Sequence, residues 1–484
     1  MDRQEAERIY DAGKEAVVET LLKTATRIRE LEKLEQRVIE LEQIVARLTR
    51  NSSNSSRPPS SDPPGAPKAK KKPSRRKQGG QPGHKGKKRE LLPPEEMDAI
   101  HNIFPQSCKY CSLPFSQEFK VPTPHPLRQQ VFELPEIVPI KTEYRCHTLR
   151  CSCGCHTTAS LPEEVARSEF GPRVHAAVAY LAALHRVSRR GIAEIIETFF
   201  NISIATGTIC NAAERVSEAC LPVVDTIKRY IASALTLNID ETGWKYKGKR
   251  RYLWTFVGLR AVLFHISPSR GAKVLGEILG EIYTGVITSD DHSAYSCYQK
   301  GLRQLCWAHL IRKLKALKED RSSPHHAYCF AKNMLAEIGT IFSRWHAFKN
   351  SGGNRDQLWR DTQPMQDRMR DYCIIFRYSS DARVQTRTKR LLDNWHHLFT
   401  FLKHEGVEPT NNIAERALRP AVQWRKICFG SQSVIGEHFT GRLLSVVRTC
   451  QIQGINAFDF LAKLVAAAFS PSMSLPSLPL ALPT

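Results

Sequence analysis

The spacing of apolar residues near the amino end predicts a helix with a narrow apolar stripe. From Leu31 onward, apolar residues recur at alternating steps of three and four, with Glu, Lys, Gln and Arg between them. The stripe consists of Leu31, Leu34, Val38, Leu41, Val45 and Leu48. Such a repeat is typical of a coiled coil, so we expect residues 1–50 to form a coiled-coil helix that joins copies of the chain. A lone amphipathic helix packed on its own protein is the alternative.

The apolar pattern stops at residue 51. Residues 51–92 contain little that could be buried, and we expect a disordered basic linker there. Between Lys68 and Arg89 the chain has eleven Lys or Arg and no acid, with the glycine-rich run 79–86 in the middle. Glycines that let the backbone approach a groove, set among basic side chains, favour DNA contact over a merely solvated tail. The candidate DNA-binding residues here are Lys70, Lys71, Lys72, Arg75, Arg76, Lys77, His84 and Lys85.

Helical spacing returns at residues 166–230. Apolar residues from Val174 to Leu184 fall on one face, and a further helix is expected to begin near Thr206. Basic residues flank the first helices, namely Arg186, Arg189 and Arg190. A helix-turn-helix unit that reads DNA and plain helical packing both agree with this pattern.

Strand patterns, rich in β-branched and aromatic residues, begin at residue 235. The four predicted strands are 235–240, 252–259, 261–267 and 285–289. A helix is expected over 272–283, between the third and fourth strands. Three strands, a helix and a fourth strand match the opening of an RNase H-like fold, in which the fourth strand joins the sheet in parallel. The sequence therefore predicts an RNase H-like catalytic core at residues 231–430.

A long helical stretch interrupts this core at about 310–402. The connection from Asp290 to Glu415 far exceeds an ordinary loop, so an inserted helical subdomain is expected. Residues 431–470 are predicted to be helical, and residues 471–484, with repeated Ser, Leu and Pro, to form a disordered tail. The expected fold class is thus a multidomain α+β protein.

The charge of the chain indicates a polyanionic partner. The 484 residues include 71 Lys and Arg against 48 Asp and Glu, a formal net charge of +23. Nucleic acid or an anionic membrane surface would suit this balance. The sequence has no apolar run of the roughly 20 residues that span a bilayer and no secretory signal. We therefore expect a soluble, cytoplasmic protein with no membrane partner.

Cysteines cluster in residues 93–165, which we predict to be a zinc-binding domain. The chain has 14 cysteines, and Cys108 and Cys111 form a CxxC pair. A second group follows about forty residues later, in which Cys151 and Cys153 are the favoured pair and Cys155 is a further donor. Four thiolates from two such groups would close a structural Zn²⁺ site. Cysteines buried without metal are the alternative.

Three carboxylates carry the candidate chemistry, namely Asp240, Asp290 and Glu415. The two aspartates close strand-like runs, and the glutamate lies in a predicted helix. An RNase H-like sheet would bring the three together to hold two divalent ions, Mg²⁺ or Mn²⁺, for phosphodiester chemistry. Glu241 and Asp291 rank second, because neighbours on a strand point to opposite faces. Each acid alone is also explained by a turn, a helix cap or a capping box.

The chain resembles the transposases of the IS66 family of bacterial insertion sequences. The motifs that carry the resemblance are the stripe near the amino end, 51–62, 79–86, the cysteine cluster, 240–244, Cys306-Trp-Ala-His309 with Arg312 and Lys313, 411–420 and 429–431. The resemblance implies a DDE transposase that uses Asp240, Asp290 and Glu415 on the inverted repeats of its element. It also implies a zinc-binding domain and companion proteins from the same element.

Two positions depart from the family pattern. The family usually has Asp-Gly-Tyr at the second carboxylate, whereas this chain has Asp290 and Asp291 followed by His292. The match of 293–295 downstream favours Asp290. The second cysteine pair departs as well. From Cys306 and His309 we expect structural support or DNA contact, and the candidate DNA-binding residues in this region are His309, Arg312, Lys313 and Arg416.

The function expected from these features is DNA transposition. The protein would cut at the ends of its element and join the freed 3′ hydroxyl to target DNA, acting as a homo-oligomer near the bacterial nucleoid. The alternative is a decayed or companion-dependent relative that only occupies the inverted repeats. A stand-alone nuclease or resolvase is a third interpretation, distinguished by hydrolysis without joining.

Overall fold

The computed structural model describes residues 3–48, 86, 89–117, 124, 126–298, 301–320, 323–470 and 472–480. These residues fall into two units. One unit comprises Met1–Ala69, Thr142–Thr198 and Ile202–Thr484, and the other comprises Lys70–Lys141 with Phe199–Asn201. Each unit is described by itself below. None of the described helices is both long and apolar enough to cross a membrane.

The helix predicted at the amino end is present. It consists of α1 (Arg3–Asp11) and α2 (Lys14–Leu48), which are separated at Gly13, a residue with φ +100°. The seam residues Leu31, Leu34 and Val38 are 53%, 58% and 53% exposed. Apolar side chains this exposed along one stripe agree with a helix that pairs with a partner. The coiled coil itself stays a prediction.

In the unit that contains residues 70–141, the described residues have little regular structure. They include the helical turn η2 (Pro94–Glu96) and an isolated bridge between Ser107 and Pro114. Leu92 and Gln130 hold two extended segments together, because the Gln130 side chain accepts from the Leu92 backbone N–H and donates to its carbonyl. A small hairpin, β1 (Thr148–Arg150) with β2 (His156–Thr158), belongs to the larger unit.

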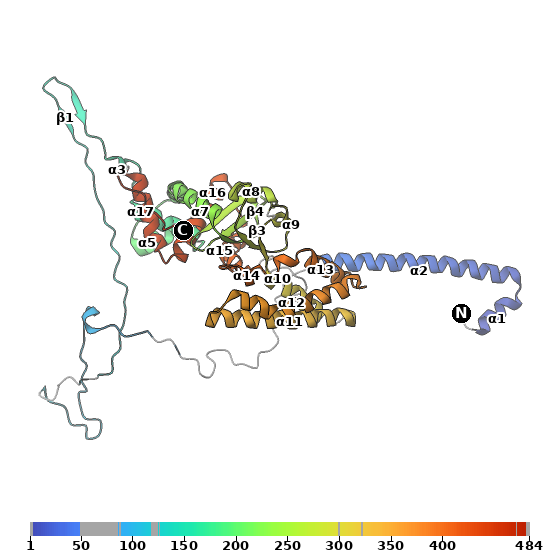
Figure 1. The fold of residues 1–484 in the computed structure, drawn as a ribbon. Coiled ribbons are helices and arrows are strands. Elements are labelled where there is room, and N and C mark those ends of the chain that lie inside the picture. Colours follow the sequence, from blue (N-terminus) through green and yellow to red (C-terminus); the bar gives the residue numbers. More distant parts are fainter. Residues whose placement is uncertain are drawn as a thin grey trace. The chain divides into compact units, whose positions relative to one another are not determined.

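A five-stranded mixed sheet forms the centre of the larger unit (Figure 1). Its strands are β3 (Thr236–Tyr246), β4 (Lys249–Val257), β5 (Val262–Ser267), β6 (Val286–Ser289) and β7 (Arg303–Leu305). The order is β5-β4-β3-β6-β7; β3, β4 and β5 are antiparallel neighbours, while β6 lies parallel to β3 and β7 parallel to β6.

The four predicted strands and the parallel fourth strand are thus confirmed. Two details were wrong. The first strand does not end at Asp240 but continues to Tyr246, so Asp240 lies in its middle, and the turn is Lys247-Gly248. The strand β7 was missed as well, because it lies before the predicted helical stretch and has only three residues, too few for a readable alternation.

Helices cover both faces of the sheet. One face and the helices upstream share a continuous core, to which Ile239, Trp254, Ile192 and Val216 contribute. The other face is covered by α15, which contributes Ala414, Ala417, Leu418 and Ala421 beside Trp244 and Leu253. The helices around the sheet are α3 (Glu163–Ala166), α4 (Pro172–Ala183), α5 (Arg189–Phe200), α6 (Thr206–Ala219), α7 (Leu221–Ser233), α8 (Ala272–Leu279), α9 (Ser293–Tyr298), α15 (Asn412–Cys428), α16 (Val434–Ile452) and α17 (Ala457–Phe469).

The edge strand β5 is closed off by α16. Val262 and Phe264 donate their backbone N–H groups to the hydroxyls of Thr449 and Ser445, at 3.0 and 2.8 Å. Gly441 of α16 lies against the Phe264 carbonyl, where a Cβ would be 3.2 Å away. The helix therefore supplies hydrogen-bond partners that a further strand would otherwise supply, which keeps this edge from pairing with other chains.

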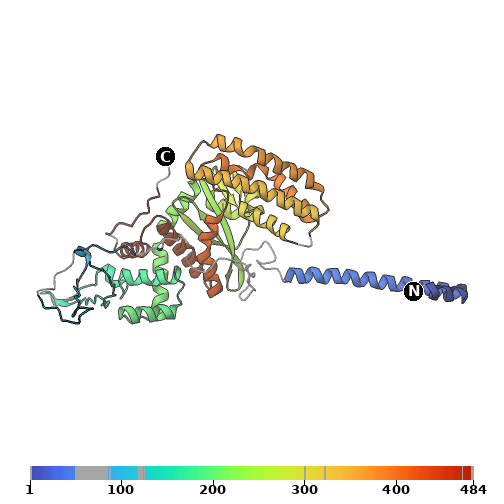
Figure 2. The same cartoon turned by 90° about the horizontal axis from the view of Figure 1, so that it is seen from below.

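The predicted helical insertion is present as a separate cluster of buried residues. Its long helices α11 and α12 lie side by side (Figure 2). The insertion consists of α10 (Trp307–Glu319), α11 (His325–Ser351), α12 (Arg355–Ile375), η4 (Phe376–Tyr378), α13 (Ala382–Asp393), η5 (Trp395–His397) and α14 (Thr400–Lys403). Buried aromatic residues, among them Trp307, Phe330, Trp345 and Phe401, fill its core.

The predicted domain boundaries stay predictions, and two observations bear on them. The helices of 166–230 share their core with the sheet, so they are packed onto it. Residues 472–480 of the predicted disordered tail form no helix or strand, yet Leu478 is buried against the same core. The remaining residues of that tail, 471 and 481–484, lie outside the described part of the chain.

Candidate active site

The alternation of β3 determines which acids face α15. Asn238, Asp240 and Thr242 share one face, because successive strand residues point to opposite sides. Contacts with α15 and the residue before it identify this face: Asn238 donates to the side chain of Asn411, and Arg425 donates to Thr242. Asp240 is therefore placed on the side of the sheet that carries Glu415.

Strand register brings Asp290 beside Asp240. In the parallel pair of β3 and β6, Asn238 lies opposite Thr288, so Asp240 and Asp290 occupy equivalent positions two residues further along. Beyond the end of β6, the Asp290 carboxylate accepts the backbone N–H of His292 at 3.0 Å. This local turn fixes the direction of the side chain as α9 begins.

The pKa of Asp240 is affected by the acids that surround it. Burial raises its pKa well above the ordinary value, and the nearby carboxyls of Glu241, Asp290 and Glu415 raise it further. The backbone N–H of Glu241, which donates to Asp240, opposes this rise. Four acids thus influence one another at one place in the fold.

The acids adjacent to the two aspartates already have partners. The Glu241 side chain is only 1% exposed, pairs with Arg270 at 2.7 Å and accepts the hydroxyl of Tyr295. Asp291 pairs with Arg390 of the insertion at 3.2 Å. Glu241 is therefore bound by Arg270 and Tyr295, and Asp291 by Arg390. Asp240 and Asp290 are the acids of these two pairs that remain available to the site.

Glu415 lies in the first turn of α15, and Asn411 fixes that turn to the sheet. The fully buried Asn411 side chain donates to the Ile239 carbonyl at 2.7 Å and accepts from Asn238 at 3.0 Å. Its own carbonyl accepts the backbone N–H of Glu415 at 3.1 Å. The alternative of a capping box at 412–415 is not what forms, because Asn411 precedes the helix and directs its side chain to β3 instead.

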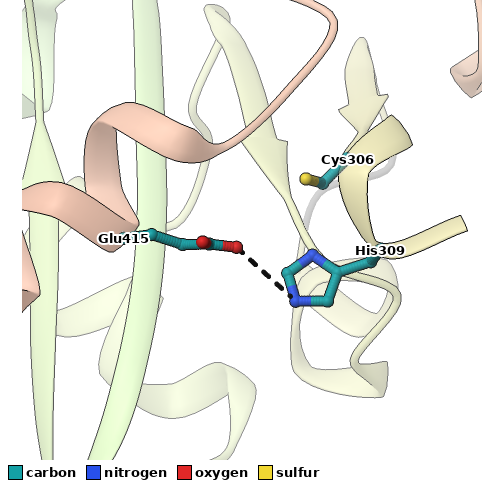
Figure 3. A group of neighbouring side chains, drawn as sticks. All are labelled: Cys306, His309 and Glu415. Carbon is teal, nitrogen blue, oxygen red and sulfur yellow. Dashed lines mark ion pairs between the residues drawn. The ribbon is translucent and has the colours of Figure 1, made fainter. Parts of the chain in front are cut away.

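Cys306 and His309 lie next to Glu415 (Figure 3). The ligand atoms of these three side chains all fall within 4.8 Å of one another, close enough to hold a metal ion together. The Cys306 sulfur accepts the backbone N–H of Asn411 at 3.1 Å, and burial raises the pKa of its thiol. We interpret Cys306 as a support that ties the start of α10 to the start of α15.

His309 and Arg312 approach Glu415 from α10. The Nε2 atom of His309 is 3.8 Å and a guanidinium nitrogen of Arg312 is 3.7 Å from the Glu415 carboxylate. Burial and the neighbouring Arg312 lower the pKa of His309. Among the described residues, the buried Nδ1 of His309 and Nη1 of Arg312 have no hydrogen-bond partner. Polar atoms left in this state beside carboxylates suit a bound group.

This donor set fits a hard divalent cation. Magnesium and manganese take carboxylate oxygens, and three acids that repel one another are relieved when a divalent ion lies between them. Asp240, Asp290 and Glu415 could hold such ions.

The other predicted DNA-binding residues divide into two groups. Lys313 is half-buried near Asp291, and burial lowers its pKa, while Arg416 is exposed on α15. The residues of the basic linker lie outside the described part of the chain, namely Lys70, Lys71, Lys72, Arg75, Arg76, Lys77, His84 and Lys85.

Each cysteine group forms a turn of its own. Backbone N–H groups of Cys111 and Tyr110 lower the pKa of Cys108, and that of Cys153 lowers the pKa of Cys151. Cys151 and Cys155 are further joined through their backbones at 2.7 Å. Thiols that accept backbone N–H groups in this way are inclined to ionise, as metal ligands must. Cys108 and Cys111 belong to the unit of residues 70–141, and Cys151, Cys153 and Cys155 to the other.

Several residues of the site escaped the sequence analysis. Asn411 and Tyr295 belonged to quoted motifs but received no role, and Arg270 and Arg390 were not mentioned. Their contacts join residues 29 to 99 positions apart. The one available signal was Asn411 itself, an amide directly before a predicted helix start.

Comparison with known proteins gives a family for this region. The model of a family described as "Transposase IS66 family" matches residues 167–438, more than half of the chain. A model of a family of unknown function (DUF6444) matches residues 6–90. The uncharacterized protein y4hP of Sinorhizobium fredii is 22% identical over 299 residues, which cover 55% of this chain and 53% of that protein. The chain therefore spans about half the length of this relative.

Proposed function

Because the chain belongs to the IS66 family of transposases, we propose that it cuts DNA at the ends of an insertion sequence and joins them to target DNA. Its catalytic core would be RNase H-like. The strand order β5-β4-β3-β6-β7, with two parallel strands after three antiparallel ones, supports this. Asp240, Asp290 and Glu415 would be the catalytic residues.

The observation that carries the proposal is the effect of Asp290 and Glu415 on Asp240. Burial and Glu241 raise the pKa of Asp240, and Asp290 and Glu415, which follow it by 50 and 175 positions in the sequence, raise it further. A fold stabilised for its own sake would not gather like charges at partly buried positions. Divalent cations bound between these carboxylates would compensate their repulsion.

In the proposed reaction, Asp240, Asp290 and Glu415 would together hold the divalent ions. Mg²⁺ bound there would lower the pKa of the attacking oxygen and stabilise the leaving oxygen. Asn411 would keep the helix of Glu415 in register with the strand of Asp240 through its bonds to Ile239 and Asn238.

Phosphate groups of DNA would be held by the cationic end of α10. His309 and Arg312 each carry a buried nitrogen that has no partner among the described residues. Both lie beside Glu415, so a phosphate near the metal site would come within their reach. Lys313 and Arg416 would add positive charge around it.

Two further parts of the proposal concern assembly. We propose that Zn²⁺ is held by Cys108, Cys111, Cys151 and Cys153, with Cys155 as the alternative donor, because both cysteine turns present thiols to backbone N–H groups. The exposed stripe of α2 would join copies of the chain. The basic linker would contact DNA, and companion proteins of the element would assist.

A cleavage assay tests the proposal. Purified protein is incubated with a labelled duplex that carries an end of the element, with Mg²⁺ or with EDTA, beside the Asp240→Ala protein. Nicking only with metal and only by the unmutated protein, followed by joining to a second duplex, is the expected result. Binding without cleavage, also after the other proteins of the element are added, would refute a catalytic role and favour a protein that only occupies the repeats.

A further inference from the structure

The turn between β3 and β4 carries a dense positive charge that the proposed active site does not use. We call residues 245–251 the basic hairpin. It contains Lys245, Lys247, Lys249, Arg250 and Arg251 and no acid. The first four are exposed, and only Arg251 has an acid within ion-pair distance in the described part of the chain, Glu437 at 3.6 Å. Like charges this close repel one another unless an anion lies among them.

The basic hairpin is held rigidly. Ser431 donates its backbone N–H to the Lys245 carbonyl at 2.8 Å and accepts that of Lys247 at 2.9 Å, while its hydroxyl accepts the Trp244 indole at 3.1 Å. Gly430, at φ +113°, lies so close to Lys245 that a Cβ would collide with its carbonyl. A charged loop that is only solvated does not need such anchoring.

An exposed apolar surface adjoins this anchor. Ile427 and Phe429 are 62% and 68% exposed, and Val434 and Ile435 are about half exposed. Phe429 ends α15 in the left-handed conformation, at φ +60°, where glycine is usual. A bulky aromatic residue kept exposed in a strained conformation suggests a use for its ring.

The basic hairpin lies on the same strand as the proposed catalytic acid. Lys247 lies seven positions after Asp240, which is about 23 Å along an extended strand. This length corresponds to roughly seven base pairs of duplex DNA at 3.4 Å each. A duplex whose scissile phosphate lies at the carboxylates is thus long enough to reach the hairpin.

We propose that the basic hairpin and Phe429 form a binding site for the sugar-phosphate backbone of double-stranded DNA. The lysines and Arg250 would neutralise phosphates, and the Phe429 ring would lie against the sugars or bases. Contacts of this kind position a duplex without reading its sequence. The inference rests on the proposed function for its choice of DNA as the polyanion.

The salt dependence of DNA binding tests the inference without catalysis. Affinity for a labelled duplex of about 40 base pairs, the scale of a few helical turns, is measured in EDTA over a series of salt concentrations. The test variant is the triple substitution Lys245→Gln, Lys249→Gln and Arg250→Gln. The control variant removes three exposed charges from the insertion by Lys332→Gln, Arg360→Gln and Arg370→Gln.

We expect the hairpin variant to bind at least about tenfold more weakly at moderate salt, and its log–log salt slope to fall by about 2–3. The control variant should keep the slope of the unmutated protein within about one. Equal slopes for the hairpin variant and the unmutated protein would overturn the inference and leave the proposed function standing. The expected fall in slope for the hairpin variant, together with no metal-dependent cleavage by the unmutated protein, would support the inference and refute the proposed function.

Phe429→Gly supplies a second measurement that a structural role would not explain. Glycine suits the left-handed position, so the melting temperature should stay level or rise. Affinity for the duplex should nevertheless fall several-fold, since the substitution removes the contact of the aromatic ring with the nucleic acid. Unchanged affinity would exclude the Phe429 ring from the site.

Discussion

Without metal, the acidic residues of the candidate site lower the stability of the folded protein. The pKa of Asp240 is raised because the side chain is buried and because Glu241, Asp290 and Glu415 lie near it. Between the pKa of the unfolded chain and the higher pKa of the folded protein, the folded state binds the extra proton. Stability therefore falls as the pH rises through this window and stays low above it.

Replacing Asp240 by Asn should therefore stabilise the metal-free protein at neutral pH. The amide carries no charge to desolvate, and each kcal/mol gained corresponds to a rise of about 2–4 °C in melting temperature for a domain of this size. The difference from the unmutated protein should shrink toward about pH 4, near the ordinary pKa of Asp. Differential scanning fluorimetry in EDTA measures both effects.

Asp225→Asn is the matched control, since Asp225 is exposed on α7 and should leave the melting temperature nearly unchanged. A melting temperature of the Asp240→Asn protein equal to or below that of the unmutated protein would contradict the crowding of acids around Asp240.

At the scale of elements, the site depends on how α15 is tied to β3. Asn411 makes bonds to Ile239, Asn238 and Cys306, so one side chain and its backbone connect the strand, the start of α10 and the start of α15. Asn411→Ala removes the two side-chain bonds, one to the Ile239 carbonyl and one from the Asn238 amide.

We expect Asn411→Ala to lower the free energy of unfolding by roughly 1–3 kcal/mol. Single-turnover cleavage should slow more than DNA affinity weakens, because Glu415 loses its position and the DNA surface does not. Asn412→Ala, at the exposed neighbouring position, is the control. If the variant binds DNA poorly but cleaves bound DNA at the normal rate, Asn411 does not position Glu415.

The helix α2 gives a second prediction at this scale. Leu34→Glu together with Leu41→Glu should reduce the mass of the particle in light scattering, because charges at a/d positions oppose coiled-coil pairing. Gln36→Glu, on a polar position of the same helix, should leave the mass unchanged. A monomeric unmutated protein, or a double variant with the mass of the unmutated protein, would contradict self-association through α2.

The elements also show what the sequence could and could not predict. The long strands and helices around the sheet were predicted where they carry a repeated pattern, as in Val174, Ala177, Val178 and Leu181 of α4. The continuation of β3 past Asp240 was missed because Glu241 and Gly243, residue types that are rare in strands, follow directly. The partners Arg270 and Arg390 could not be predicted, since ion pairs across 29 and 99 residues leave no local pattern.

At the scale of the whole molecule, zinc would tie together cysteines from two parts of the chain. We expect about one Zn²⁺ per chain, as four thiolates close one tetrahedral site. The pairs Cys108→Ser with Cys111→Ser, and Cys151→Ser with Cys153→Ser, should each abolish zinc content measured by mass spectrometry of the metal. The control Cys297→Ser changes an exposed cysteine outside both groups, and this variant should keep its zinc content. Full zinc content in either pair variant would refute the shared site.

The central claim is that Asp240, Asp290 and Glu415 form one metal-dependent catalytic site. The most direct measurement compares single-turnover cleavage of end DNA by the Asp290→Asn and Asp291→Asn proteins in Mg²⁺, with the unmutated protein alongside. We predict that Asp290→Asn loses at least about a hundredfold in rate, as expected for a ligand of a catalytic metal. Asp291→Asn should stay within about tenfold, because Asp291 is paired with Arg390. The reverse order of the two rates would contradict the account.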